Sequence, residues 1–275
     1  MGRLRYGTSS WSEKSWAGVF YPAGLKPGEW LRHYATQFDT VEADVTYYRV
    51  PDERLVRGWD EKTPAGFALS AKFPRAIVHG GEGATPDPKK VLVPDAVAAD
   101  LKQFLGAMAL LGDKCGPLVM QFPYFNRSVF AEPAAFLERL ERFLGLLPER
   151  FRYAVEIRNK AWIGAELLGL LRAHRVALVW VEIAYMPHPE RLARDLDLVT
   201  TDFAYARLIG ERAAVEERTT TFDRIVVDQS KSLERWSRLL RATLERVPET
   251  FAYANNHYAG HAPATIRELA RQTLG

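Results

Sequence analysis

The stretch RYAVEIR, residues 152–158, shows most directly how this chain folds. Every second residue from Tyr153 to Ile157 is apolar, and the residues between and after them include Glu156 and Arg158. This two-residue period is typical of a β-strand with two different faces. If the apolar face packs against helices, Glu156 and Arg158 point the other way, into the interior of a barrel.

Similar β-rich runs recur along the chain and alternate with segments of helical spacing. The helical spacing is clearest over Ser232–Val247 and weakest over Pro187–Leu196. The seven other β-rich runs are Arg3–Ser9, Thr40–Tyr47, Phe67–Phe73, Leu118–Phe122, Val176–Glu182, Phe203–Ile209 and Phe251–Asn256. Eight strands and about eight helices in 275 residues predict an α/β fold, a single-domain (β/α)₈ TIM-like barrel over residues 1–275. An open dinucleotide-binding sheet is disfavoured, because no G-x-G-x-x-G follows the first strand.

Two long segments, residues 74–95 and 210–230, do not fit the strand–helix pattern. Each follows a predicted strand, so each is expected on the C-terminal face of the barrel. Active sites of such barrels are built on that face, where long loops form lids or ligand walls.

Composition and charge narrow the classes of function. The chain has 37 Lys and Arg against 34 Asp and Glu, a net charge of +3, which is too small for a dedicated nucleic-acid binder. Its single cysteine, Cys115, excludes an intramolecular disulfide and a cysteine-based zinc site. No apolar run approaches the ~20 residues of a membrane span, and the N-terminus lacks the apolar stretch of a signal peptide. We therefore expect a cytoplasmic protein without a membrane partner, and its oligomeric state is left open.

The same alternation predicts an unusual number of polar side chains inside the barrel. Barrel interiors are normally filled by Val, Ile and Leu, whereas here carboxylates face Lys and Arg near the C-terminal ends of the strands. One interpretation is a structural network of ion pairs, and the other, which we favour, is the mouth of a functional site. Besides Glu156 and Arg158, the inward set is Glu42, Asp44, Thr46, Ser70, Lys72, Gln121, Trp180, Glu182, Arg207 and Asn255.

Several stretches of the sequence match a known family. They are GTSSW (7–11), VFYPAGL (19–25), FDTVEADVTYYRVP (38–51), TPAGFALSAKFPR (63–75), GPLVMQFP (116–123), VEIRNKAW (155–162), YARLIG (205–210) and YANNHYAGHAP (253–263). Through them, from Tyr6 to about Leu269, the sequence resembles the YecE-like family, known as domain of unknown function seventy-two. The resemblance implies a TIM-barrel fold and leaves the activity open, because none is established for the family. At four places the sequence departs from the family pattern: Ser10 replaces Gly, Ala43-Asp44 replaces Ile-Asn, Asn159-Lys160 replaces His-Pro, and Ile209 replaces a common His.

The favoured hypothesis is acid–base chemistry on a small polar or anionic molecule, phosphorylated or sugar-like. Glu42 and Glu156 are expected to form the general acid–base pair, and Lys72 joins them as the third candidate catalytic residue. Arginine forks suit bidentate binding of carboxylate or phosphate, and aromatic faces can stack on a ring or a sugar. The candidate ligand-binding residues are Trp11, Asp44, Tyr47, Gln121, Arg158, Glu182, Arg207, Asn255 and Asn256.

Three alternatives remain open. No metal or other cofactor is expected, but Glu42, Glu156 and His257 offer a donor set for Mg²⁺ or Mn²⁺, which would suit phosphodiester hydrolysis. Nucleic acid is a possible partner but not the favoured one, because acidic residues interleave with the loop bases. A barrel that binds its ligand without chemistry is the third alternative.

Overall fold

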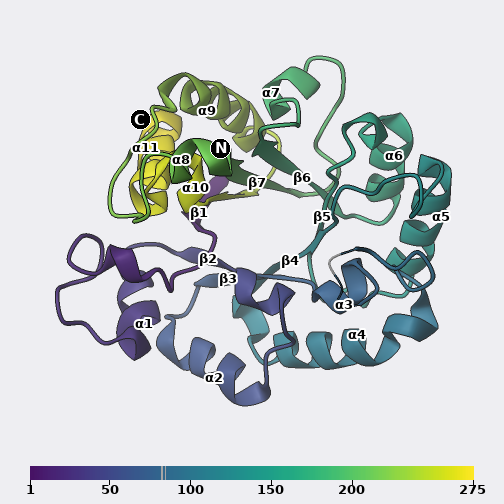
Figure 1. Cartoon of the computed structure of the whole chain (residues 1–275), viewed down its shortest axis with the longest axis horizontal. Coiled ribbons are helices and arrows are strands. Elements are labelled where there is room, and N and C mark those ends of the chain that lie inside the picture. Colours follow the sequence, from purple (N-terminus) through teal and green to yellow (C-terminus); the bar gives the residue numbers. More distant parts are fainter. Residues whose placement is uncertain (82, 84) are drawn as a thin grey trace.

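The computed structural model describes every residue except 82 and 84. Over the described residues it has eight parallel strands, hydrogen-bonded in the order β1-β8-β7-β6-β5-β4-β3-β2, and helices surround them (Figure 1). The predicted (β/α)₈ barrel is therefore confirmed. The strands are β1 Arg3–Thr8, β2 Thr40–Ala43, β3 Ala68–Lys72, β4 Cys115–Gln121, β5 Tyr153–Glu156, β6 Ala177–Ile183, β7 Phe203–Gly210 and β8 Glu249–Ala254.

The helices follow the strands as expected, although several are short. The helix predicted over Ser232–Val247 is α9, and the weakest candidate becomes α7, which has only four residues. The helices are α1 Trp30–Tyr34, α2 Glu53–Lys62, α3 Arg75–Val78, α4 Pro94–Ala109, α5 Pro133–Leu144, α6 Ala165–Ala173, α7 Pro189–Leu192, α8 Arg212–Glu216, α9 Ser230–Leu244, α10 Asn256–Ala259 and α11 Ala262–Leu274. The 3₁₀ turns of the described residues are η1 Lys14–Trp16, η2 Pro27–Glu29, η3 Asp44–Tyr47, η4 Gly112–Lys114 and η5 Lys160–Trp162.

A side chain helps to close the barrel between β1 and β2. These strands share only an isolated bridge between Ser9 and Glu42 within the described residues. Next to it, the Tyr34 hydroxyl accepts a hydrogen bond from the Thr8 amide at 2.8 Å and lies 3.2 Å from the Thr40 carbonyl oxygen, to which it donates. The phenol therefore occupies the place of a missing ladder bond, and its burial is consistent with the rule that buried backbone groups find a partner.

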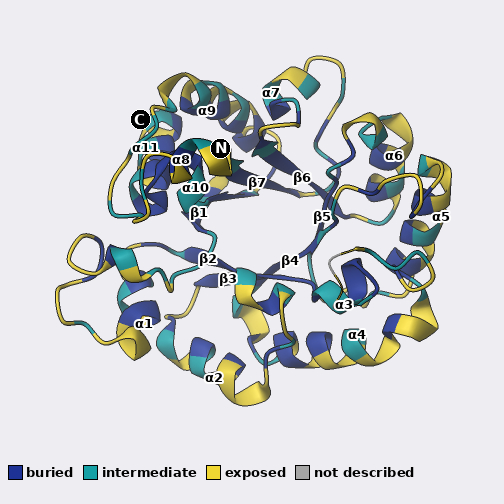
Figure 2. Cartoon of the chain, viewed as in Figure 1, coloured by how far each residue is buried: buried dark blue, intermediate teal, exposed yellow. Residues whose placement is uncertain are grey.

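The core has two layers, one inside the barrel and one between the strands and the helices. In Figure 2 most of the strands are buried, and the helices are buried toward the strands and exposed outward. At the N-terminal end of the barrel, Glu249 binds both Arg5 and Arg152, which closes that end with ion pairs. The inner layer consists of Ala68, Val119, Ala154, Ala177, Val179, Val181, Ile183, Met186, Phe203, Tyr205, Phe251 and Tyr253.

The prediction for strand β6 is wrong, because Trp180 and Glu182 face outward. Val179 and Val181 fill the interior, while the Trp180 indole donates to the Leu198 carbonyl outside the barrel. The Glu182 carboxylate accepts hydrogen bonds from side chains of α9 and α10: Ser232, Trp236 and Tyr258, at 2.5–2.9 Å. From Ala177 to Val181 the strand is apolar on both faces, so its sequence does not distinguish inside from outside.

The predicted second strand is too long. It ends at Ala43, and residues 44–47 form η3, so Asp44 and Tyr47 reach the mouth of the barrel from a turn instead of a strand. The long segments 74–95 and 210–230 follow β3 and β7 and contain α3 and α8; residues 82 and 84 of the first lie outside the described residues. No helix in the described part of the chain is long and apolar enough to cross a membrane.

Candidate functional site

Arg207 is the centre of a buried cluster of charges at the C-terminal ends of the strands. It lies on β7, and its side chain crosses the barrel interior, where it is 2% exposed. Its Nη2 donates to Glu42 Oε1 at 2.8 Å, and its Nη1 donates to Gln121 Oε1 at 2.8 Å and also binds Glu156 Oε2. The residues predicted to meet in the mouth from β2, β4, β5 and β7 are therefore brought together.

The two glutamates of this cluster stay ionised. Burial opposes the charge on Glu156, but Arg207 and Arg158 outweigh it and lower the pKa of Glu156 to about 2. Burial also opposes the charge on Glu42, where Arg207 and Lys72 hold the pKa below its ordinary value. Tyr205 supports Glu42 by donating its hydroxyl hydrogen to Oε2 at 2.7 Å. Both carboxylates are thus fixed negative charges at neutral pH.

Lys72 is the cation of the mouth that is least well paired. Its Nζ lies 3.9 Å from Glu42 Oε1 and forms no hydrogen bond with any described residue. Thr46 holds the backbone of Lys72 on both sides, since its hydroxyl accepts from the Lys72 amide at 2.9 Å and donates to the carbonyl at 2.7 Å. Burial, and then the charge of Arg207, lower the pKa of Lys72. Burial likewise raises the pKa of the neighbouring Asp44.

Arg158 extends the cluster toward solvent. Its Nε donates to Glu156 Oε1 at 2.8 Å, and 24% of its side chain is exposed. Its two terminal amino groups form no hydrogen bond with the described residues and remain available as donors. Arg158 and Lys72 are therefore the two cations of the cluster that can take up a further negative group.

Tyr47 pairs with His79 at the edge of the mouth. The Tyr47 hydroxyl lies 2.8 Å from His79 Nε2, and the imidazole is buried. Burial, together with the charges of Arg75 and Arg158, lowers the pKa of His79 to about 4, so its ring is neutral at pH 7. The charge of Arg158 acts on Tyr47, whose hydroxyl is already engaged by His79.

Three other candidate residues have structural contacts of their own. Trp11 packs edge-on against Trp59, with ring centroids 5.7 Å apart, and lines a groove beside α2. Asn255 caps α10 by accepting from the His257 amide at 3.0 Å. Asn256 accepts from the Trp16 indole at 3.3 Å and from the Ala262 amide at 3.0 Å.

The donor set considered for Mg²⁺ or Mn²⁺ does not assemble. His257 Nε2 lies 3.3 Å from Glu216 Oε1 on α8, whereas Glu42 and Glu156 are bound to Arg207. In the part of the chain that the structure describes, no three His, Cys, Asp or Glu side chains are placed to hold a metal ion. Glu182 also lies away from Glu42 and Glu156, because it faces Trp236 outside the barrel.

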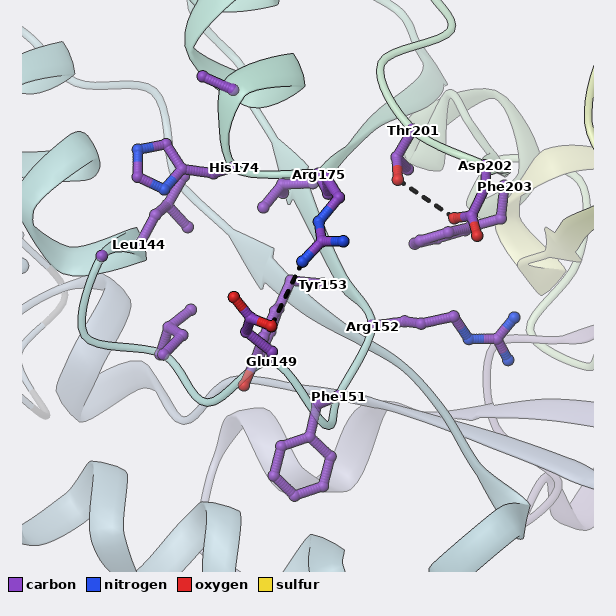
Figure 3. Close-up of a pocket in the computed structure, with 14 residues that line it drawn as sticks. Leu144, Glu149, Phe151, Arg152, Tyr153, His174, Arg175, Thr201, Asp202 and Phe203 are labelled. Carbon is purple, nitrogen blue, oxygen red and sulfur yellow. Dashed lines mark hydrogen bonds and ion pairs between the residues drawn. The ribbon is translucent and has the colours of Figure 1, made fainter.

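Two large cavities lie away from the charge cluster. One, of about 620 Å³, is at the N-terminal end of the strands, where Glu149 pairs with Arg175 and Thr201 with Asp202 (Figure 3). The first pair is 3.4 Å apart and the second 3.2 Å. The other, of about 1060 Å³, is the groove beside α2 that Trp11 lines. Residues of the charge cluster line neither of them.

Sequence reasoning missed two residues of the mouth. Tyr205 was detectable, because it lies two residues before Arg207 on the same strand and therefore shares its face. His79 gave no such signal, since it follows α3 in a segment without a regular period.

The strand order and the ion pairs at the C-terminal ends of the strands define a TIM-barrel-like protein with a charged mouth. More particularly, the chain belongs to the DUF72 family, described as a protein of unknown function, which its residues 5–274 match. It is 30% identical over 153 residues to the UPF0759 protein YecE of Escherichia coli K12, covering 56% of this chain and 47% of YecE. The same holds for YecE of Escherichia coli O157:H7, so the chain spans about half the length of these relatives.

Solved structures support the same fold. A DUF72 protein from Thermotoga maritima is 26% identical, with a TM-score of 0.72 and 98% of both chains covered. A DUF72 protein from Enterococcus faecalis is 19% identical, with a TM-score of 0.66, covering 99% of this chain and 96% of that one. SacUVDE, 11% identical with a TM-score of 0.51, covers 98% of this chain and 99% of its own and shares the fold.

Proposed function

We propose that the mouth of the barrel binds a small polar or anionic molecule through Lys72 and Arg158, and that Lys72 exchanges a proton with it. The observation that carries this proposal is the environment of the Lys72 ammonium. It is buried beside Arg207, 3.9 Å from Glu42, and without a hydrogen-bond partner among the described residues. A largely desolvated ammonium that forms no hydrogen bond with the described residues favours either a bound anion or loss of its proton.

Lys72 has the properties of a proton-transfer group. Desolvation and a neighbouring cation lower the pKa of a lysine, which makes its neutral amine accessible at a lower pH than usual. Both factors act on Lys72. The clamp by Thr46 fixes the backbone of Lys72, so its side chain is aimed from a rigid strand end. The function includes acid–base chemistry, with Lys72 as the base or acid.

In this proposal Glu42 and Glu156 are positioning residues and not the general acid–base pair expected from the sequence. A general acid must carry a proton near the working pH, and both carboxyl groups have pKa values held below their usual range. Their oxygens also accept hydrogen bonds from Arg207, Arg158 and Tyr205. They therefore serve as positioning residues, which fix the guanidinium groups and set the field around Lys72.

Charge favours an anionic ligand. Three cations, Lys72, Arg158 and Arg207, face the ionised Glu42 and Glu156. The third carboxyl group, Asp44, has a raised pKa because of burial, which favours its neutral form. Arg158 presents two unused amino groups in the planar arrangement that suits carboxylate or phosphate oxygens. A phosphorylated or carboxylated small molecule fits these donors.

Inorganic phosphate is a suitable first probe, with binding measured by calorimetry at moderate salt. Wild-type protein is expected to bind it, and Lys72→Gln and Arg158→Gln are each expected to weaken binding by about tenfold or more, as for loss of a charged hydrogen bond. Lys102→Gln, at an exposed position on α4, is the matched control and should bind as wild type does. Equal binding by wild type, Lys72→Gln and Arg158→Gln would overturn the proposed ligand site.

The proton-transfer part has its own test. The pKa of Lys72 can be followed by NMR of ¹⁵N-labelled lysine, with Lys72→Gln to assign the signal. We expect it to titrate below the ordinary 10.5. Titration at or above 10.5 would leave a binding barrel without acid–base chemistry, which is the alternative function.

A further inference from the structure

A small cavity lies beside the charged mouth, on the same face of the barrel. It has a volume of about 310 Å³ and lies between the segment after β4 and the segment after β5, near the start of α5. Asn159, one of its lining residues, directly follows Arg158 in the sequence, so their Cα atoms are about 3.8 Å apart. The cavity and the Arg158 side of the mouth are therefore neighbours along the chain.

Aromatic rings form the wall of the cavity. Phe125 and Trp162 are stacked, with centroids 6.0 Å apart and planes inclined by 20°, and Phe130 meets Phe125 edge-on at 5.1 Å. Two of these rings, Phe125 and Phe130, are buried, while Trp162 keeps part of its surface exposed in the cavity. The exposed part of the Trp162 ring, supported by the two buried rings behind it, thus offers aromatic surface to a planar partner.

The wall is rigid. The buried Asn159 side chain accepts from the Phe125 amide at 2.8 Å and donates to the Phe125 carbonyl at 2.8 Å. These two hydrogen bonds tie the segment after β4 to the segment after β5 across the cavity. A cavity with fixed walls orders few side chains when a ligand binds, and this helps affinity.

The rim of the cavity is mainly cationic. Arg127 and Lys160 are exposed lining residues, opposed by Glu132. Among the described residues, neither cation forms an ion pair or side-chain hydrogen bond, and the Trp162 indole N–H has no acceptor. Unengaged cations and a free N–H above an aromatic wall suit a ring that carries negative charge.

We infer that this cavity binds the aromatic ring of an anionic ligand, and that the molecule bound at the mouth is an aromatic phosphate or carboxylate. The second part of this inference rests on the proposed function, because it assigns the class of molecule that Lys72 and Arg158 bind. The first part rests on the cavity alone.

Three probes of graded shape test the inference on the full chain by calorimetry: phenyl phosphate, cyclohexyl phosphate and inorganic phosphate. Phenyl phosphate is expected to bind about tenfold tighter than either of the others, as one aromatic stacking contact would provide. Trp162→Leu should abolish this preference. Ala131→Phe, which places a bulky ring at a lining position without removing a core side chain, should abolish it as well and serves if Trp162→Leu does not fold.

The matched control is Leu146→Ala, which removes an exposed apolar side chain that does not line the cavity; it should keep the preference. Equal affinity of wild type for phenyl and cyclohexyl phosphate would overturn the inference, as would a preference that survives in both cavity variants. If inorganic phosphate binding depends on Lys72 and the ring adds nothing, the inference fails and the proposed function stands. If the ring preference depends on Trp162 and is unaffected by Lys72→Gln and Arg158→Gln, the cavity site is supported and the proposed function fails.

Discussion

The Nη2 atom of Arg207 on β7 lies 2.8 Å from the Oε1 atom of Glu42 on β2, although β8 and β1 separate these strands in the sheet. The contact is buried, since the side chains are 2% and 0% exposed. The same guanidinium also binds Glu156, so one cation compensates two carboxylates that water does not reach. Arg207 therefore contributes to the stability of the barrel and also fixes the charges at its mouth.

Replacing Arg207 by methionine should destabilise the protein strongly. Arg207→Met leaves two buried carboxylates with much less compensation, and breaking a buried ion pair in this way costs about 3–5 kcal/mol. Urea unfolding measures the change. Arg142→Met is the control, because its pair with Glu138 is 70% and 62% exposed and should contribute less than about 1 kcal/mol. Similar losses for the two variants would contradict the central role of Arg207.

Acid should destabilise the protein through Glu156. The pKa of Glu156 is about 2 in the folded chain, below its ordinary value of 4.5. Between these pH values the unfolded chain takes up a proton that the folded chain does not, so stability falls as the pH decreases from 4.5 toward 2. Unfolding free energies measured from pH 6 to pH 3 should show a shallower decline in Glu156→Gln. The exposed Glu166→Gln should follow wild type; an equally steep decline in Glu156→Gln would refute the assignment.

Titration of His79 should make the stability of the protein depend on pH over a higher range than titration of Glu156 does. The pKa of His79 falls from 6.5 to about 4 on folding, because burial disfavours the charged ring. The unfolded chain therefore binds more protons between pH 6.5 and 4, and stability decreases as the pH falls through this range. His79→Gln, which can still bond to Tyr47, should flatten the profile there. Tyr47→Phe removes the hydrogen bond but not the titrating ring, so it should retain the slope; a slope unchanged in His79→Gln would argue against this origin.

Removing the Tyr34 hydroxyl should weaken the β1–β2 seam. In Tyr34→Phe the Thr8 amide and the Thr40 carbonyl lose a buried partner, at a cost of about 1–3 kcal/mol. Hydrogen exchange should be faster at the Thr8 amide than in wild type, and urea unfolding gives the total loss. Tyr48→Phe, at a side chain that is 68% exposed, is the control. Unchanged exchange at Thr8 would show that the seam does not depend on the phenol.

The sequence identified the barrel because its signals are local. Strand and helix periods, together with their alternation, predict parallel βα units, and a closed barrel accommodates eight of them in 275 residues. Where a strand has one apolar and one polar face, as around Glu156, its orientation also follows from its own residues. Glu42, Lys72, Gln121 and Arg207 were placed in the mouth on this basis, and the structure has them there.

Tertiary structure decided what neighbouring residues alone do not encode. Strand β6 is apolar on both faces, so only its packing against α9 shows that Glu182 points outward to Trp236. The partners of Arg207 come from three other strands, and the low pKa of Glu156 arises from their joint burial, which no local pattern records. Residue types and strand periods are properties of the chain itself. The pairing, desolvation and proton affinity of its charges exist only once distant segments meet in the folded barrel.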